Sequence, residues 1–407
     1  SVPGSSVRSI IMSTITFWLS VILIFMIPWE NAITFEGFGT IGRAVGFLVL
    51  FSWIVTVAGR GQFRKLKFFH LTVFIFVLWN ILSIMWTLDV DRTTVRIITY
   101  IQIFGFVLIL WDLYKTRAAL TVGLQAYILG AYVSIVAVVI NFMTDTHVHV
   151  QSRYTGTGFN ENAVAFLLAL GIPLAWHLAT SDKNNTKKYI RAILNVLNFA
   201  YIPSAIFAIL LTASRGGFIC IFPGLLFIFG SIAKVKLHQR FAIFAALGAL
   251  LLFTPSIPES SLTRLSTIGD SFLQGDLGGR GSFWQESLIV FLEHPLLGVG
   301  SYAYKTISPS GNIPHNTFIS VLVEGGVIGF SIFMTIFAFT IYYALKQSKR
   351  DTRLWLTILL IWFLDVNTFA WEYRKATWLF FSLIIISANL SQTADEEESK
   401  ISLTPIQ

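Results

Sequence analysis

Long apolar runs, each near the length of a membrane-spanning helix, alternate with short polar stretches along the chain. A bilayer core about 30 Å thick requires roughly 20 apolar residues of helix, and twelve runs approach this length. We therefore expect an all-α polytopic membrane protein with about twelve transmembrane helices. The expected spans are residues 10–29, 41–58, 68–88, 95–111, 118–142, 163–179, 192–212, 216–233, 239–253, 316–345, 354–370 and 376–391.

Basic residues are divided unevenly between the polar stretches on the two sides of the expected bilayer. The set that contains both ends of the chain holds 19 Lys and Arg residues, and the other set holds 10. By the positive-inside rule the first set is cytoplasmic, so we expect both termini and the tail 392–407 in the cytoplasm. The external set includes one long segment, residues 254–315, between the helices of 1–253 and those of 316–391.

Composition supports the membrane assignment and excludes several other classes. Of 407 residues, 55% are hydrophobic and 12% are charged, and the mean hydropathy is +0.71, which excludes a soluble globular protein. The single cysteine, Cys220, excludes an internal disulfide and a cysteine zinc cluster. We expect no signal peptide, because the first apolar run is too long for one. The net charge of +8 follows topology, so we expect no nucleic-acid partner.

Arginine is concentrated on the external side. Only 8 of the 19 cytoplasmic basic residues are Arg, whereas 8 of the 10 external ones are. A planar guanidinium holds phosphate or carboxylate bidentately, so this bias favours an external anion site. The alternative is that these arginines pair with external carboxylates such as Asp89, Asp91, Glu161 and Glu372, or extend to the interface. The eight are Arg43, Arg92, Arg96, Arg153, Arg215, Arg264, Arg280 and Arg374.

Two of these arginines stand where a polar head group can reach them. Arg215 lies in the tight turn 213–217 between two apolar spans, where an unpaired charge is costly and two glycines leave room beside it. Arg280 comes just before an amphipathic stretch, 282–292, that we expect to lie on the membrane surface as a helix. Alternatively, Arg215 is an interfacial anchor and Arg280 is solvated in a flexible glycine-rich loop.

His315 stands at the head of the expected tenth span. A neutral imidazole can accept a proton from a sugar hydroxyl as a general base, although a lone histidine can equally be structural. Glu324 lies about two and a half turns deeper and must face the bundle interior or be paired. Asp365, in the eleventh span, can pair with Arg374 in the next external turn.

The remaining polar features narrow the chemistry. The loop 153–162 supplies glycines, amides and a further arginine on the external face. We interpret His147 and His149 as surface residues, because no ligand set completes a metal site around them. Neither a glycine-rich nucleotide loop nor a D-x-D pair in the long external segment is present. We therefore expect the energy source to be an activated lipid.

Three blocks resemble the O-antigen ligase and polymerase superfamily of polytopic glycosyltransferases. His315-Asn316, nine further residues and Gly326-Val327-Ile328-Gly329 fit the ligase pattern H-[NSQ]-x9-G-x-x-[GTY]. Gly279-Arg280 with Trp284, together with block 294–300 (HPLLGVG), resembles the family's external-loop block. The turn 214–217 (SRGG) resembles its arginine-bearing hairpin. The likeness covers residues 150 to 375.

The resemblance implies a C-type membrane glycosyltransferase fold in the bacterial inner membrane, acting at the periplasmic face with inversion and without metal or cofactor. It implies that Arg215 and Arg280 bind the diphosphate of an undecaprenyl-linked donor and that His315 orients or deprotonates the acceptor hydroxyl. Substrate contacts are expected from Arg153, Asn160, Asn162, Asn316, Trp284 and Arg374, with Glu324 and Asp365 in support.

Three functions remain open at this point. The preferred one is a ligase that transfers a finished polysaccharide from undecaprenyl diphosphate to a lipid A-core acceptor. A polymerase that joins lipid-linked repeat units of an O antigen or exopolysaccharide carries the same motifs, because only the acceptor differs. A twelve-span transporter is disfavoured, since the chain has few midplane charges, mainly Glu324 and Asp365, and no repeated halves.

Overall fold

The structure is a computed structural model, and the protein within the residues it describes is almost entirely helical. The described residues are 3–37, 39–146, 153–181, 187–269 and 280–402. Their two strands, β1 (Thr34–Phe35) and β2 (Gly39–Thr40), form one antiparallel hairpin.

The helices follow one another along the whole chain. The first seven are α1 (Pro3–Met26), α2 (Ile41–Arg60), α3 (Phe68–Leu82), α4 (Val90–Leu113), α5 (Arg117–Met143), α6 (Glu161–Thr180) and α7 (Lys188–Leu211). The others are α8 (Arg215–Phe229), α9 (Leu237–Phe253), α10 (Glu259–Ser266), α12 (Arg280–Glu293), α13 (Tyr304–Ile307), α14 (Thr317–Leu345), α15 (Lys349–Val366) and α16 (Lys375–Ser402). Short 3-10 turns are η1 (Ile27–Trp29), η2 (Ser83–Met85), η3 (Ile232–Lys234) and η4 (Thr254–Ser256).

Nine of the described helices are long and apolar enough to cross a membrane, so the chain is an all-α, multi-pass membrane protein. All twelve predicted spans are helical, but three do not reach this standard. α8 and α9 contain only 15 and 17 residues, and α15 carries five charged residues in its 18. The number of twelve crossings therefore stays a prediction.

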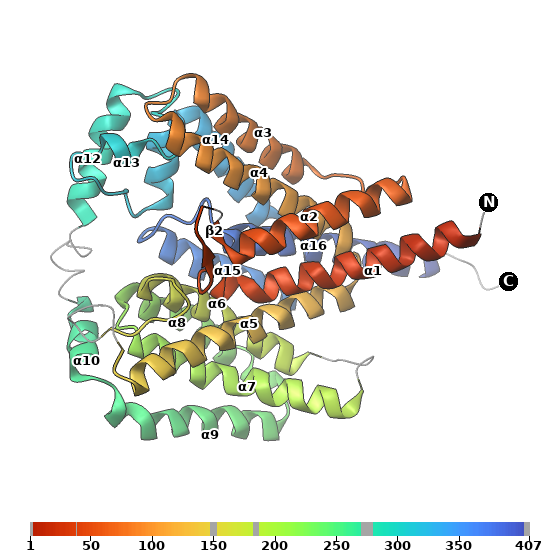
Figure 1. Cartoon of the computed structure of the whole chain (residues 1–407). Helices are drawn as coiled ribbons and strands as arrows, with labels where there is room; N and C mark the ends of the chain where they lie inside the picture. The colour runs from red at the N-terminus through yellow and green to blue at the C-terminus, as the bar shows by residue number, and fades with distance from the viewer. Residues whose placement is uncertain (1–2, 38, 147–152, 182–186, 270–279, 403–407) are drawn as a thin grey trace.

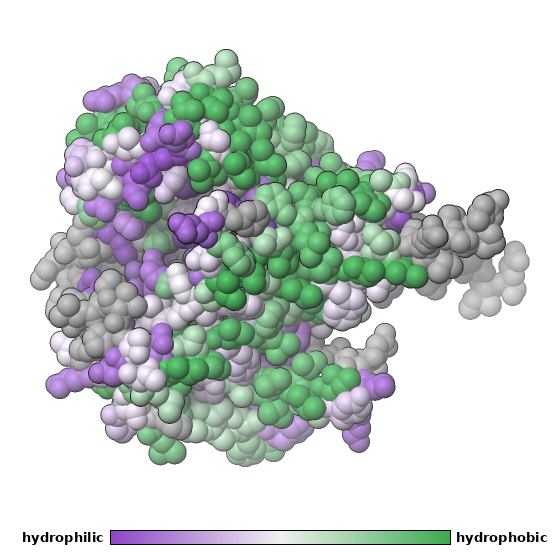
Figure 2. All heavy atoms as spheres, viewed as in Figure 1, coloured by the Kyte–Doolittle hydropathy of each residue, from purple (hydrophilic) through white to green (hydrophobic). Residues whose placement is uncertain are grey.

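The two ends of the helical bundle differ in what they carry. α1 begins and α16 ends at one end, at the right in Figure 1, whereas α10, α12 and α13 lie at the opposite end. In Figure 2 hydrophobic residues cover much of the flank between the ends, and hydrophilic residues gather near α12. A bundle with its flank in lipid is expected to have this distribution. Which end faces the cytoplasm stays a prediction.

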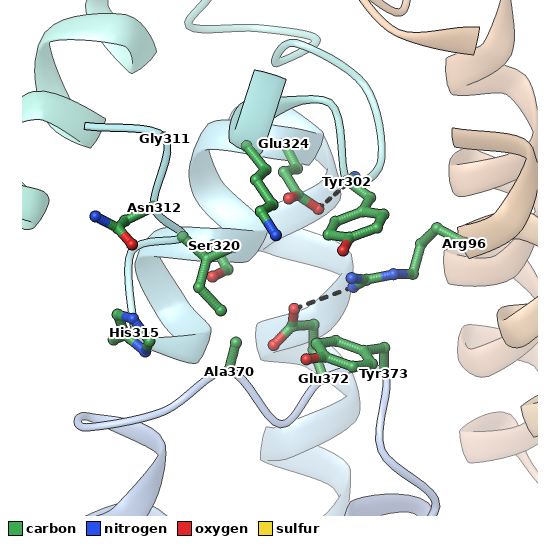
Figure 3. Close-up of a pocket in the computed structure, with 12 residues that line it drawn as sticks. Arg96, Tyr302, Gly311, Asn312, His315, Ser320, Glu324, Ala370, Glu372 and Tyr373 are labelled. Carbon is green, nitrogen blue, oxygen red and sulfur yellow. Dashed lines mark hydrogen bonds and ion pairs between the residues drawn. The ribbon is translucent and has the colours of Figure 1, made fainter. Parts of the chain in front are cut away.

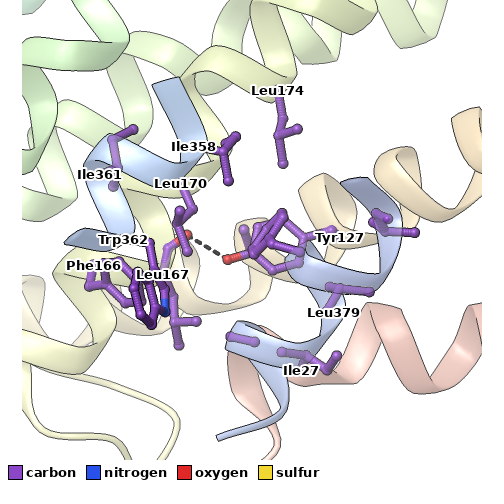
Figure 4. Packing of buried hydrophobic residues seen from close by; sticks show 14 of the residues in the cluster. Ile27, Tyr127, Phe166, Leu167, Leu170, Leu174, Ile358, Ile361, Trp362 and Leu379 are labelled. Carbon is purple, nitrogen blue, oxygen red and sulfur yellow. Dashed lines mark hydrogen bonds between the residues drawn. The ribbon is translucent and has the colours of Figure 1, made fainter. Parts of the chain in front are cut away.

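The central helix is α6, which packs against α5, α7, α8 and α15. In its apolar window 89% of the residues are buried, as expected of a helix that is hydrophobic on all faces. Gly171 permits the close approach of α7, because a Cβ there would lie 2.2 Å from the Tyr201 hydroxyl oxygen. On the other side, the Tyr127 hydroxyl of α5 donates a 2.8 Å hydrogen bond to the Leu167 carbonyl (Figure 4). Contacts with α5 and α7 thus hold the middle of α6 within the bundle.

The long helix α14 is interrupted at Gly326, whose φ of 65° and ψ of −172° are not helical. The break exposes backbone groups, and the segment before α13 pairs with them. Three backbone hydrogen bonds of 2.9 to 3.0 Å join the two segments: Val299 N–H to Val323 C=O, Gly300 N–H to Glu324 C=O, and Val327 N–H to Pro295 C=O. The end of the long external segment is therefore fastened to α14.

Glycines make this attachment possible. A Cβ at Gly326 would lie 2.1 Å from the Leu296 carbonyl oxygen, and a Cβ at Gly298 would lie 2.4 Å from the Glu324 carbonyl oxygen. Both glycines have positive φ, a conformation that favours glycine. Gly298 and Gly326 thus have a common structural cause, which is the docking of the external segment onto the broken helix.

Candidate active site

The hairpin between α7 and α8 positions Arg215. Ser214 caps α8: its hydroxyl accepts a 3.2 Å hydrogen bond from the Gly217 N–H and donates one of 2.8 Å to Asn162 Oδ1 at the start of α6. A Cβ at Gly217 would lie 2.2 Å from the Ala165 Cβ, so the start of α8 lies directly against α6. Arg215 is therefore the first residue of a helix whose N-terminus is held against the central helix.

Arg153 connects the starts and ends of neighbouring helices. Its Nε donates to the Thr212 carbonyl at 3.1 Å, its Nη2 donates to Asn162 Oδ1 at 3.1 Å, and its Nη1 lies 3.7 Å from Glu161 Oε2. Asn160 caps α6 by accepting a 2.8 Å hydrogen bond from the backbone N–H of residue 163. Three residues that were predicted to contact the substrate thus stabilise the local structure. They are Arg153, Asn160 and Asn162.

Four arginines from different segments of the chain interact through their charges. They are Arg153, Arg215, Arg264 and Arg280. Burial lowers the pKa of Arg280, and the charges of Arg215 and Arg264 lower it further. Burial is also the main cause that lowers the pKa of Arg153 and of Arg264, with neighbouring arginines adding to it. Arginine stays protonated at neutral pH, so the group, which we name the arginine cluster, is a concentration of positive charge that a bound anion would stabilise.

Asp365 is the carboxylate beside the arginine cluster. A Cβ at Gly216 would lie 3.8 Å from Asp365 Oδ1, and the Asp365 charge raises the pKa of Arg280. Its Oδ2 accepts a 2.5 Å hydrogen bond from Trp371 Nε1, whereas Oδ1 is buried and has no hydrogen-bond partner among the described residues. Among the described residues the expected ion pair between Asp365 and Arg374 does not form, because the indole of Trp371 occupies the space beside the Asp365 carboxylate.

His315 lies in the turn that leads into α14. Asn316 caps this helix, since its Oδ1 accepts hydrogen bonds of 2.9 and 3.1 Å from the N–H groups of residues 318 and 319. His315 has a φ of 51°, in the left-handed region, and its ring lies between Phe283 of α12 and Phe369, at centroid distances of 6.1 and 5.9 Å. Burial lowers the pKa of His315, and the charge of Arg280 lowers it further. The imidazole is therefore neutral near pH 7 and able to accept a proton.

His315 also lines a cavity of about 270 Å³ that sequence reasoning did not foresee (Figure 3). Its wall combines residues from α4, the segment around α13, α14 and the turn between α15 and α16. They are Arg96, Tyr302, Lys305, Gly311, Asn312, Ile313, His315, Ser320, Glu324, Ala370, Glu372 and Tyr373.

The far wall of this cavity is a buried ion-pair network. Arg96 Nη1 lies 3.4 Å from Glu372 Oε1, and its guanidinium lies between the rings of Tyr302 and Tyr373, 4.5 and 3.7 Å from their centroids. Glu324 accepts a 2.7 Å hydrogen bond from the Tyr302 N–H. Burial raises the pKa of Glu372, and the Arg96 charge opposes this rise. Glu324, predicted to support the site, thus lies within this network.

The external arginines divide between the two interpretations of the sequence. Three of them pair with carboxylates named as alternatives: Arg92 with Asp89 at 3.3 Å, Arg96 with Glu372 at 3.4 Å and Arg153 with Glu161 at 3.7 Å. Arg215, Arg264 and Arg280, with Arg153, form the cluster, which favours the anion-site interpretation for them.

Three members of these groups were not predicted as site residues. Arg264 lies on α10, an eight-residue helix that was not predicted, and the signal for it in the sequence was the concentration of arginine on the external side. Arg96 and Glu372 are separated by 276 positions, so no local pattern links them.

The other predicted residues lie at the edges of the site or away from it. Trp284 is on α12, and its indole Nε1 is buried without a hydrogen-bond partner among the described residues. Arg374 packs over the rings of Phe159 and Tyr373 and lines a separate cavity of about 190 Å³ with Arg43. His147, His149 and the glycines at 278–279 lie outside the described residues.

A metal centre is not evident in the part of the chain that the structure describes, where no group of three or more His, Cys, Asp or Glu side chains is placed to hold an ion. Residues 200–334, about a third of the chain, match the family described as O-antigen ligase. No curated protein matches the chain.

Proposed function

We propose that the protein transfers a polysaccharide from undecaprenyl diphosphate to a lipid A-core acceptor. The match of residues 200–334 to the family described as O-antigen ligase supports an activity of the ligase or polymerase type. We place the reaction at the periplasmic face of the bacterial inner membrane, with both termini in the cytoplasm. The observation that supports this best is the arginine cluster next to a neutral histidine. The cluster supplies the charge that a diphosphate needs, and the histidine supplies a base for a hydroxyl.

The donor binds through its diphosphate. The guanidinium groups of Arg215 and Arg280 hold phosphate oxygens bidentately, and Arg264 adds a third positive charge. As the bond between the anomeric carbon and the diphosphate oxygen breaks, negative charge grows on the leaving group. The same cations stabilise this charge in the transition state, so they lower the barrier as well as bind the donor. In this proposal no metal ion takes part.

The acceptor hydroxyl attacks from the side of His315. Its oxygen forms the new bond to the anomeric carbon on the face opposite the diphosphate, so the configuration inverts. The hydroxyl proton passes to the neutral imidazole, and undecaprenyl diphosphate leaves. Asp365, whose buried Oδ1 lies beside α8, balances part of the cluster's charge.

A polymerase that joins two lipid-linked repeat units is the second candidate, because it uses the same donor chemistry. Expression in a ligase-null strain and in a polymerase-null strain separates the two. We expect long chains on lipid A-core in the ligase-null strain when the lipopolysaccharide is resolved on a gel. Long chains that stay on the carrier lipid there would contradict the ligase assignment.

The purified full-length protein in detergent is expected to transfer glycan from undecaprenyl diphosphate to lipid A-core. Product is measured by gel shift of the acceptor and by release of undecaprenyl diphosphate. Transfer without a second compartment distinguishes an enzyme from a transporter, because transport requires a sealed vesicle. Failure with both lipid A-core and a second lipid-linked glycan as acceptor would contradict both enzymatic assignments.

The acid limb of the activity profile is expected to report His315. A general base works in its neutral form, and burial together with Arg280 holds its pKa below the ordinary 6.5. Activity is therefore expected to persist at pH 6.5 and to decline only as the pH falls through this lowered pKa. The measurement is kcat/KM from about pH 5 to 8. A decline centred above 6.5 would rule out His315 as the base. His315→Asn should remove the acid limb along with most of the activity.

A further inference from the structure

The cavity beside His315 differs in charge from the arginine cluster. None of the four clustered arginines is among the described residues that line it. Its charged lining residues are Arg96, Lys305, Glu324 and Glu372. The charges of these two cations and two carboxylates cancel. The arginine cluster, by contrast, has four positive charges and only two neighbouring carboxylates, Glu161 and Asp365. The cluster suits a diphosphate, and the cavity suits an uncharged group that is rich in hydroxyls.

Two groups in the cavity wall have unused hydrogen-bonding capacity. Glu372 is only 2% exposed, and its Oε2 has no hydrogen-bond partner among the described residues. The side chain of Lys305 lines the cavity and makes no hydrogen bond or ion pair with any described residue. A buried acceptor without a partner is costly, so a ligand that donates to it is favoured. A sugar hydroxyl can donate to Glu372 while another accepts from Lys305.

The cavity is small and its wall is fixed. Its volume of about 270 Å³ lies just under the range of roughly 300 to 1,000 Å³ common for small-molecule sites, so it fits one sugar ring and not an oligosaccharide. Arg96 is held between Tyr302 and Tyr373, and Glu324 is held by the Tyr302 N–H. A wall fixed before binding loses little entropy when a ring enters.

The position of the cavity relates it to the chemistry. In Figure 3 His315 stands at one side of the cavity and Arg96 enters from the other, so a ring between them has a hydroxyl near the imidazole. We propose that the cavity binds the uncharged sugar of the acceptor that receives the glycan and presents its hydroxyl to His315. This proposal rests on the proposed function, and it makes Lys305 and Glu372 residues that determine acceptor specificity.

Steady-state kinetics of the full-length protein can separate the subsites. We choose Lys305→Met and Asn312→Ala, because both side chains are partly or fully exposed and their loss should not unfold the chain. Glu372→Gln is less suitable, since it would remove the negative charge of the only carboxylate that lies within 4 Å of buried Arg96 among the described residues. With lipid A-core as the varied substrate, Lys305→Met is expected to raise the acceptor KM about tenfold, and Asn312→Ala less. The donor KM and kcat should stay within about twofold of wild type.

The matched control is Ser310→Ala, which lies in the same loop, bonds Glu286 and does not line the cavity. It should leave both KM values unchanged. If the acceptor KM is unchanged in Lys305→Met and Asn312→Ala, the cavity assignment is overturned and the proposed function stands. A donor KM that rises as much as the acceptor KM would have the same meaning. No transfer by wild type would contradict the proposed function, and the cavity assignment would fall with it.

Discussion

Gly326→Ala is expected to abolish glycan transfer and to destabilise the protein, whereas Gly325→Ala, one position away, should behave like the wild type. Gly326 has a φ of 65° with a ψ of −172°, a region that essentially only glycine occupies, and holding an alanine there costs on the order of 1 to 3 kcal/mol. A Cβ there would also lie 2.1 Å from the Leu296 carbonyl oxygen. The docked segment must then leave α14, and the turn that carries His315 loses its support.

Gly325 provides the matched control for this experiment. It also lies in α14, but its φ is not positive, and the nearest atom to an added Cβ is Trp79 Nε1 at 3.7 Å, an ordinary contact. The measurements are transfer activity and thermal unfolding of both variants in the same detergent. Wild-type activity and stability in Gly326→Ala would mean that the break in α14 is not needed for the site.

Arg215→Lys is expected to lower kcat by about 100- to 1,000-fold while the protein still folds and reaches the membrane. Lysine keeps the positive charge but replaces the planar fork with a single ammonium, so it loses bidentate contact with the leaving diphosphate. Ser214 and Gly217, which hold the start of α8 against α6, are untouched, and the fold should therefore persist. Transfer by Arg215→Lys at the wild-type rate would remove Arg215 from the mechanism.

Arg92→Lys is the control for this substitution. Arg92 is an external arginine outside the cluster, is 37% exposed and pairs with Asp89 at 3.3 Å. Exposed ion pairs contribute little stability, and lysine can replace arginine in one, so activity and expression should both be retained. An equal loss in Arg92→Lys would show that activity depends on external arginines in general and not on the cluster.

The sequence predicted those parts of the molecule that depend on local pattern. Apolar runs of about 20 residues determine helices, so all twelve expected spans are helical. Boundaries shifted where capping groups decide them: α15 begins at Lys349 because Ser348 caps it, five residues before the predicted start. Arg215, Arg280 and His315 were found because turns and helix starts have local signatures, but their roles stay proposals.

What the sequence did not reveal depends on contacts between distant segments. The ion pair of Arg96 and Glu372 joins α4 to the turn before α16, and no spacing in the chain records it. Arg374 was expected near Asp365 because they are neighbours in sequence. In the folded chain Trp371 occupies the space beside Asp365, and Arg374 faces another cavity. The short distance along the sequence thus predicted that the Asp365 and Arg374 side chains would meet, and the packing of the large Trp371 indole prevents this contact.

The left-handed backbone of His315 has a consequence for how the residue is replaced. Alanine disfavours this conformation, so His315→Ala removes the imidazole and also strains the backbone of the turn. A single activity value for this variant would combine the two effects. Asparagine tolerates positive φ far better. Comparing the two replacements separates the chemistry of the ring from the geometry of the chain that carries it.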